Sequence, residues 1–276
     1  MDLVKSVTLG VVQGVTEWLP ISSTAHLILV PKLLGWPDPG AAGTAVMQLG
    51  TVAAVLVYFR NDLWQMTRAF LRSLRPGVDR SALPARLGWA VAAGTIPICV
   101  LGLLFRRQIE GPLRSTYVVA GAMIGMALLL WLAEVFARHR RGVEDVTVRD
   151  GWIVGAAQAI ALIPGASRSG STLTGALFAG LDREAAARFS FLLSVPAVVL
   201  SGLLEAKGVL EPGAPGVMAW GLPDLAVATV VSGLVGYASI AFLLRYLRTH
   251  STLVFVVYRL LVGSLLLYLL SRGFLT

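Results

Sequence analysis

Three ionisable residues that could do chemistry lie in two polar segments of an otherwise apolar chain. Glu17 and His26 belong to the first segment, and Arg168 belongs to the second. Such side chains at membrane depth are costly unless they are paired, hydrated or bound to a ligand, so each is a functional candidate. A carboxylate and a guanidinium that act on one headgroup would suit a phosphate ligand. The alternative is an ion pair between Glu17 and Arg168 that only holds the structure together.

In the first segment, a proline and a hydroxyl cluster follow Glu17. Pro20 ends the helix that carries Glu17, and the hydroxyls that follow can cap the next helix. If this helix begins after Ser22, then Ser23 and His26 face the same way. The sequence therefore predicts a hydroxyl and an imidazole at hydrogen-bonding distance, as activation of a nucleophile requires.

The second segment predicts a phosphate cradle. Its glycines let backbone N–H groups approach an anion, its serines add donors at a helix start, and the Arg168 fork matches phosphate oxygens. The candidate substrate-binding residues here are Gly165, Ser167, Ser169, Gly170 and Thr172. In the first segment they are Gln13, four residues before Glu17 and thus on the same helix face, and Ser22. The GxxxxGK[ST] spacing of a Walker loop is absent.

The composition identifies a membrane protein. Of 276 residues, 56% are hydrophobic and only 14% are charged. The net charge of +8 is best explained by arginines in short loops between apolar runs, and not by a nucleic-acid partner. A single cysteine, Cys99, excludes an internal disulfide and a cysteine-based metal site.

The elements that must position these residues are transmembrane helices and two broken helices. Both broken stretches, roughly residues 9–34 and 153–179, are interrupted by Pro, Ser and Gly, so neither half can cross a bilayer. We therefore predict an all-α polytopic protein with six transmembrane helices and two re-entrant helical hairpins. The six spans are expected at roughly residues 44–59, 87–105, 118–136, 189–204, 225–244 and 253–270.

The broken stretches resemble each other, which predicts an internal repeat. Gln13 matches Gln158, and Pro20 with its serines matches Pro164 with its serines. Each copy precedes three spans, and a unit with an odd number of crossings must repeat in inverted topology. We predict a single membrane domain, residues 1–276, with repeats at about 5–137 and 150–271.

The basic residues predict an orientation. If the loop at residues 60–86 is cytoplasmic, basic residues favour the cytoplasmic side by about two to one, as the positive-inside rule requires. The first hairpin then enters from outside and the second from the cytoplasm, so their tips meet within the membrane.

Two polar residues inside spans are expected mainly to make structural contacts. Arg259 should pair with a carbonyl or carboxylate of a neighbouring helix, with reaching the site as the lesser alternative. Gln48 could line the cavity, but an amide in a span more often makes a helix–helix contact.

The two segments resemble motifs of the undecaprenyl-diphosphate phosphatases associated with bacitracin resistance. Gln13 and Glu17 match the pattern (E/Q)xxxE. Residues 20–26 look like the PxSSTxH segment, and residues 164–172 look like PGxSRSxxT. The similarity extends along nearly the whole chain, so the match is highly specific.

The resemblance implies hydrolysis of undecaprenyl diphosphate to undecaprenyl phosphate and inorganic phosphate, which recycles the lipid carrier for cell-envelope polymers. It implies a multi-pass protein of the bacterial cytoplasmic membrane, surrounded by membrane lipids, with an active site open to the outer side. Glu17, His26 and Arg168 would be essential, and Ser23, Ser167, Ser169 and Thr172 would support them. Family members suggest a divalent cation, Mg²⁺ or Ca²⁺. Because Gln13 stands where many members carry Glu, Glu17 would be the one carboxylate ligand of the cation here.

Several alternatives stay open at this stage. The attacking group could be Ser23 or a water, with His26 handling the proton, and the oligomeric state is not readable. A transporter or flippase for a lipid phosphate would share the inverted-repeat architecture. A phosphatase of the phosphatidic-acid type needs the pattern SRxxxxxH, but the sixth residue after Arg168 is Thr174.

Overall fold

The computed structural model describes residues 2–37, 40–209 and 221–274, and its named elements are all helices. The first half contains α1 (Leu3–Trp18), α2 (Ser23–Leu34), α3 (Gly40–Tyr58), α4 (Arg60–Ser73), α5 (Leu83–Leu104), α6 (Arg106–Glu110) and α7 (Thr116–Phe136). The second half contains α8 (Val148–Ile160), α9 (Arg168–Phe178), α10 (Arg183–Val209), α12 (Leu222–Tyr246) and α13 (Leu253–Ser271). Residues 210–220 of the predicted second repeat lie outside the described ranges.

The six predicted spans all fall on helices. Among the described residues, α5, α7, α10, α12 and α13 are each long and apolar enough to cross a membrane. The sixth, α3, meets the same criterion only together with α4, from which it is bent by 74°. Large apolar side chains on the outer surface, such as Leu104, Leu234 and Leu261, are well exposed, as lipid contact requires. The chain is thus an all-helical polytopic membrane protein.

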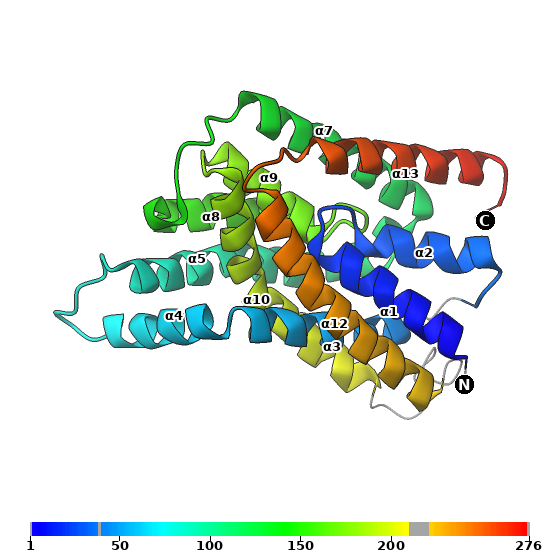
Figure 1. Ribbon diagram of the computed structural model, residues 1–276, viewed down its shortest axis with the longest axis horizontal. Coiled ribbons are helices and arrows are strands. Elements are labelled where there is room, and N and C mark those ends of the chain that lie inside the picture. Colours follow the sequence, from blue (N-terminus) through cyan, green and yellow to red (C-terminus); the bar gives the residue numbers. More distant parts are fainter. Residues whose placement is uncertain (1, 38–39, 210–220, 275–276) are drawn as a thin grey trace.

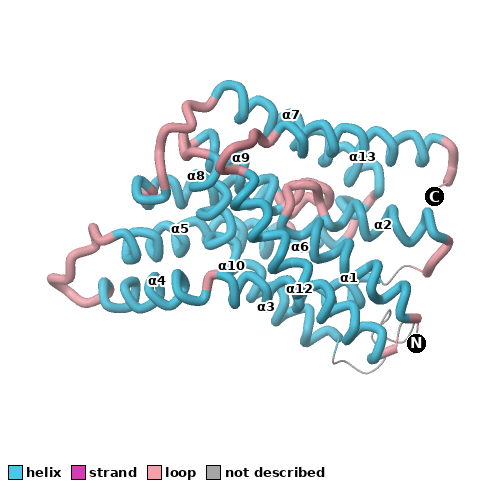
Figure 2. Tube along the Cα trace, viewed as in Figure 1, coloured by secondary structure: helices cyan, strands magenta, loops and turns pink. Residues whose placement is uncertain are grey.

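Both predicted interruptions are confirmed. The first lies at residues 19–22, between α1 and α2, and the second at residues 161–167, between α8 and α9. Leu19 has an extended backbone (φ −71°, ψ 146°), as the residue before a proline prefers, and α1 ends there. The two breaks are loop segments in the middle of a helical body (Figure 2).

Glycines on the first helix of each broken pair allow close packing against a span of the other half. A Cβ at Gly10 or Gly14 of α1 would overlap backbone oxygens of α12, and one at Gly151 or Gly155 of α8 would overlap those of α5. Small residues with this spacing let helix backbones meet in a membrane, where packing replaces the hydrophobic effect. Another pair of long helices, α7 and α13, lies along one side of the molecule (Figure 1).

The helix α4 was not predicted. The segment expected as a loop at residues 60–86 begins with α4, a well-formed helix. Its polar residues obscure a narrow apolar face, on which Met66 is buried and Phe70 packs on Gly88 and Trp89 of α5. The prediction of a loop was wrong because an amphipathic surface helix carries too few apolar residues to stand out beside membrane spans.

Candidate functional site

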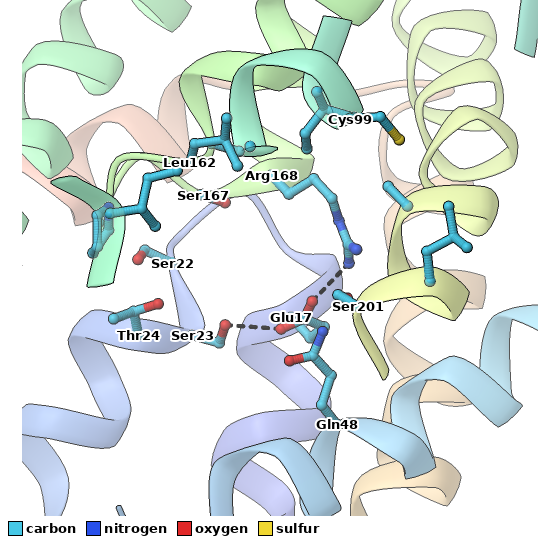
Figure 3. A pocket seen from close by; sticks show the side chains of 18 of the residues that line it. Glu17, Ser22, Ser23, Thr24, Gln48, Cys99, Leu162, Ser167, Arg168 and Ser201 are labelled. Carbon is cyan, nitrogen blue, oxygen red and sulfur yellow. Dashed lines mark hydrogen bonds and ion pairs between the residues drawn. The ribbon is translucent and has the colours of Figure 1, made fainter. Parts of the chain in front are cut away.

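The tips of the two broken helix pairs meet. The Arg168 Nη2 atom donates to Glu17 Oε1 at 2.6 Å, although the residues are 151 positions apart. Both side chains are largely buried, with 9% of Glu17 and 14% of Arg168 exposed. Figure 3 shows the guanidinium pointing at the carboxylate across the site. The predicted convergence of the two tips is therefore confirmed.

The second oxygen of the Glu17 carboxylate faces a hydroxyl. Ser23 Oγ donates to Glu17 Oε2 at 2.8 Å (Figure 3). Gln13 Nε2 donates to the same atom at 3.2 Å. Glu17 thus lies between a cation on one side and a hydroxyl on the other. In this position a carboxylate can stabilise positive charge and accept a proton from an attacking oxygen.

Hydrogen bonds tie the second break to the first. Ser169 Oγ donates to the carbonyl oxygens of Glu17 and Leu19, at 3.2 and 3.0 Å. The Ser167 hydroxyl caps α9 by accepting from the Gly170 N–H at 3.2 Å. Ser169 therefore joins the two turns to each other, whereas Ser167 holds the start of the helix that carries Arg168.

Aromatic packing fixes the guanidinium of Arg168. Its Cζ lies 5.6 Å from the centroid of the Trp18 ring, which is buried and makes an edge contact with Phe191. A cation over an aromatic face is attracted to it, more strongly where water is excluded. Trp18, directly after Glu17 in the sequence, was not among the predicted site residues. The one sign of its role in the sequence was its position next to Glu17, and a tryptophan there is equally expected from ordinary apolar packing.

His26 is not paired with Ser23. Its Nδ1 lies 2.7 Å from the Ser22 carbonyl oxygen and its Nε2 lies 2.6 Å from the Tyr258 hydroxyl. The predicted Ser23–His26 hydrogen bond is therefore wrong in this structure. The reason is that Ser23 turns toward Glu17, a partner that comes from the other side of the break.

A fully buried arginine forms hydrogen bonds with both breaks. Arg259 of α13 donates from Nη1 to the Pro20 carbonyl oxygen at 3.1 Å, and from Nη2 to those of Gly165 and Ala166 at 3.1 and 2.9 Å. Its Nε donates to the Met123 carbonyl oxygen of α7 at 3.2 Å. The prediction that Arg259 pairs with carbonyl groups is confirmed.

The acid–arginine pair opens on a cavity of about 990 Å³. Its polar end contains six of the predicted site residues, Glu17, Ser22, Ser23, Gly165, Ser167 and Arg168. Its apolar wall comes from α5, α10 and the break before α9, and includes Cys99, Leu162 and Leu200. Such a cavity fits a ligand with a charged head and an apolar body.

The structure also separates some predicted residues from the cavity and adds others. The predicted residues that do not line it are Gln13, His26, Ser169, Gly170 and Thr172. They make contacts outside the cavity lining, and Thr172 Oγ1, for example, donates to the Arg168 carbonyl oxygen at 2.9 Å. Gln48 and Arg106 also line the cavity. The sequence suggested a place in the cavity for Gln48 only as the less common alternative to a helix–helix contact. Arg106 was missed because an arginine beside a loop has a commoner explanation.

The site around Glu17 offers few ligands for a divalent cation. Within the described residues no group of three or more His, Cys, Asp or Glu side chains could hold a metal ion. Both oxygens of Glu17 already accept from Arg168, Ser23 and Gln13. Because this donor set does not fit a cation cage built from protein atoms, we derive no step through a metal ion, and the cation stays a prediction.

The fold and the site define a polytopic membrane protein with a buried acid–arginine pair at the head of an apolar-walled cavity. The chain belongs to the family described as bacitracin resistance protein BacA, whose model matches residues 6–265. Its relatives include proteins named undecaprenyl-diphosphatase from Myxococcus xanthus (53% identical over 99% of this chain and 91% of the relative) and Chlorobium phaeovibrioides (52%, 99% of both). A third, from Chloroherpeton thalassium, is 51% identical over 99% of this chain and 98% of the relative. The predicted family is therefore confirmed.

Proposed function

We propose that this protein hydrolyses undecaprenyl diphosphate to undecaprenyl phosphate and inorganic phosphate, and so recycles a lipid carrier for cell-envelope polymers. The observation that carries the proposal is the Glu17–Arg168 pair beside the Ser23 hydroxyl, at the polar end of an apolar-walled cavity. The relatives with about half their residues identical bear the name of this activity.

We propose a role for each group, and the contacts of the site support it. Arg168 binds the terminal phosphate and neutralises charge that develops on its oxygens. Ser23 Oγ attacks the terminal phosphorus and gives its proton to Glu17, while the bond from this phosphorus to the bridging oxygen breaks and the lipid phosphate leaves. Water then attacks the phosphoserine, Glu17 assists again, and inorganic phosphate and free Ser23 result. His26, which the sequence suggested for the proton, has no contact with Ser23.

We also propose that the broken helices are re-entrant hairpins of an inverted repeat, in the cytoplasmic membrane of a bacterium. Reciprocal packing supports the repeat, since α1 packs on α12 whereas α8 packs on α5. The two breaks also match in conformation, because Ser22 and Ser167 have φ of 73° and 69°. The apolar wall of the cavity would hold the prenyl chain beside membrane lipids.

Release of phosphate by the purified protein in detergent tests the function. We expect inorganic phosphate from a C55 or shorter prenyl diphosphate in multiple turnovers, measured by a phosphate-specific colorimetric assay. A transporter of lipid phosphates would bind the same diphosphate without cleaving it. Binding with no phosphate release would therefore favour transport over hydrolysis.

Cys99 offers a test of the side on which the cavity opens. It is the only cysteine in the sequence, it lines the cavity, and it is partly accessible. If the cavity opens outward, a membrane-impermeant maleimide should label Cys99 in intact spheroplasts, and prenyl diphosphate should slow the labelling. Mass spectrometry of the purified protein measures the labelled fraction.

The matched control moves the thiol to the predicted cytoplasmic side. In the double variant Cys99→Ser with Arg75→Cys, the new thiol replaces an exposed residue in the segment after α4. This variant should be labelled only after permeabilisation. The opposite pattern, with Cys99 protected until the membrane is opened, would place the mouth of the cavity on the cytoplasmic side.

A further inference from the structure

The turn that presents Ser23 contains a strained residue without a cap of its own. Ser22 has φ 73° and ψ 102°, in a region that residues with a Cβ rarely adopt. The corresponding Ser167 is held by its own hydroxyl, which accepts from the Gly170 N–H. The Ser22 side chain forms no such cap. Another group must therefore keep this turn in place.

His26 is that group. A carbonyl oxygen can only accept, so the hydrogen bond of 2.7 Å to Ser22 requires a hydrogen on His26 Nδ1. In the neutral ring Nε2 is then an acceptor, and its partner at 2.6 Å is the Tyr258 hydroxyl, which must donate. Tyr258 thus selects the tautomer of His26 that can hold Ser22.

The contact between the rings is well defined. The His26 and Tyr258 rings lie nearly parallel, with 6° between their planes and 5.5 Å between their centroids. His26 is buried, and the next residue of α13, Arg259, bonds the Pro20 carbonyl oxygen of the same break. Two consecutive residues of α13 therefore hold the break that ends at Ser22.

We infer that Tyr258 is a positioning residue of the active site: its hydroxyl fixes His26, His26 holds the Ser22 turn, and the turn keeps Ser23 Oγ on Glu17. This inference rests on the proposed function. Both ring nitrogens of His26 are engaged away from Ser23, and His26 does not line the cavity. His26 therefore acts through the backbone of the turn and not on the substrate.

Tyr258→Phe removes one oxygen and leaves the stacked ring in place. Without the donor to Nε2, the His26 ring also populates the other tautomer, which cannot donate to Ser22. We expect kcat for phosphate release to fall about tenfold while KM stays within about twofold. This pattern is typical when the lost group orients a catalytic residue but does not contact the substrate. Tyr268→Phe is the control, because this tyrosine lies on the same helix, is exposed, and contacts Arg272 instead. Its kinetics should match the wild type, and a wild-type kcat in Tyr258→Phe would overturn the inference.

Substitutions of His26 separate positioning from proton transfer. The amide nitrogen of His26→Asn lies near the place of Nδ1 and can still donate to the Ser22 carbonyl, but it is no base. We expect His26→Asn to keep at least about tenfold more activity than His26→Ala, and Tyr258→Phe to lower it by less than about twofold further, since no tautomer is left to select.

If His26→Asn were as inactive as His26→Ala, His26 would belong to proton transfer and the inference would be overturned. Failure of the proposed function appears separately, as the absence of phosphate release by the wild type itself, and would overturn both proposals.

Discussion

Replacement of Arg168 by alanine should lower kcat/KM for prenyl diphosphate hydrolysis by about a thousandfold, the size expected when a fixed charge that stabilises a transition state is removed. Arg168 reaches Glu17 at 2.6 Å in a largely buried position, and a water that filled its place would carry no charge. The rate of phosphate release measures the loss. Arg188→Ala is the matched control, because Arg188 makes an equally short ion pair with Asp62 but is about one-third exposed. Such a surface pair contributes little, and activity should be unchanged.

If the ion pair were purely structural, neutral replacements would leave phosphate release intact. Buried ion pairs can often be replaced by neutral groups of similar size without loss of stability. We therefore expect the double variant Glu17→Gln with Arg168→Met to unfold at a temperature near that of the wild type and yet to release no phosphate. Activity in this variant, or in Arg168→Ala, would show that the pair only joins the hairpins and would remove the site assignment.

Substitution of Arg259 by methionine should produce the largest loss of stability. Its guanidinium is fully buried and donates to carbonyl oxygens of both breaks and of α7. A buried acceptor left without its donor costs about 1–3 kcal/mol, and several are lost together, so we expect a loss of roughly 3 kcal/mol or more. Thermal unfolding in detergent, followed by size-exclusion chromatography, measures this effect.

The conservative variant Arg259→Lys keeps the charge and isolates the geometric role. An ammonium group is compact and lacks the planar fork, so it cannot bond Pro20, Gly165 and Ala166 together. We expect this variant to fold, with kcat about a hundredfold lower, because a small displacement of one turn separates the reacting groups. Arg272→Lys, at the exposed end of the same helix, should behave like the wild type. A wild-type kcat in Arg259→Lys would contradict a role in aligning the two breaks.

Local physical chemistry explains what was predicted correctly. Long apolar runs predict spanning helices because a bilayer requires both length and internal hydrogen bonding. Pro20, Pro164 and the serines beside them predict the breaks because a proline lacks the N–H of a helical hydrogen bond and the neighbouring hydroxyls can cap a new helix. The meeting of Glu17 with Arg168 could be predicted because unpaired charges in a membrane are expensive and each was the natural partner of the other.

The sequence by itself therefore determined the membrane class, the family motifs, the two breaks and the opposite charges that meet there. Only the tertiary structure decided that Ser23 bonds Glu17, that His26 bonds Tyr258, and that α4 is a helix. Helical spacing predicts only how a side chain points relative to its own helix. The choice between two partners within reach depends on the packing of α13 and the second hairpin, elements more than a hundred residues away in the chain.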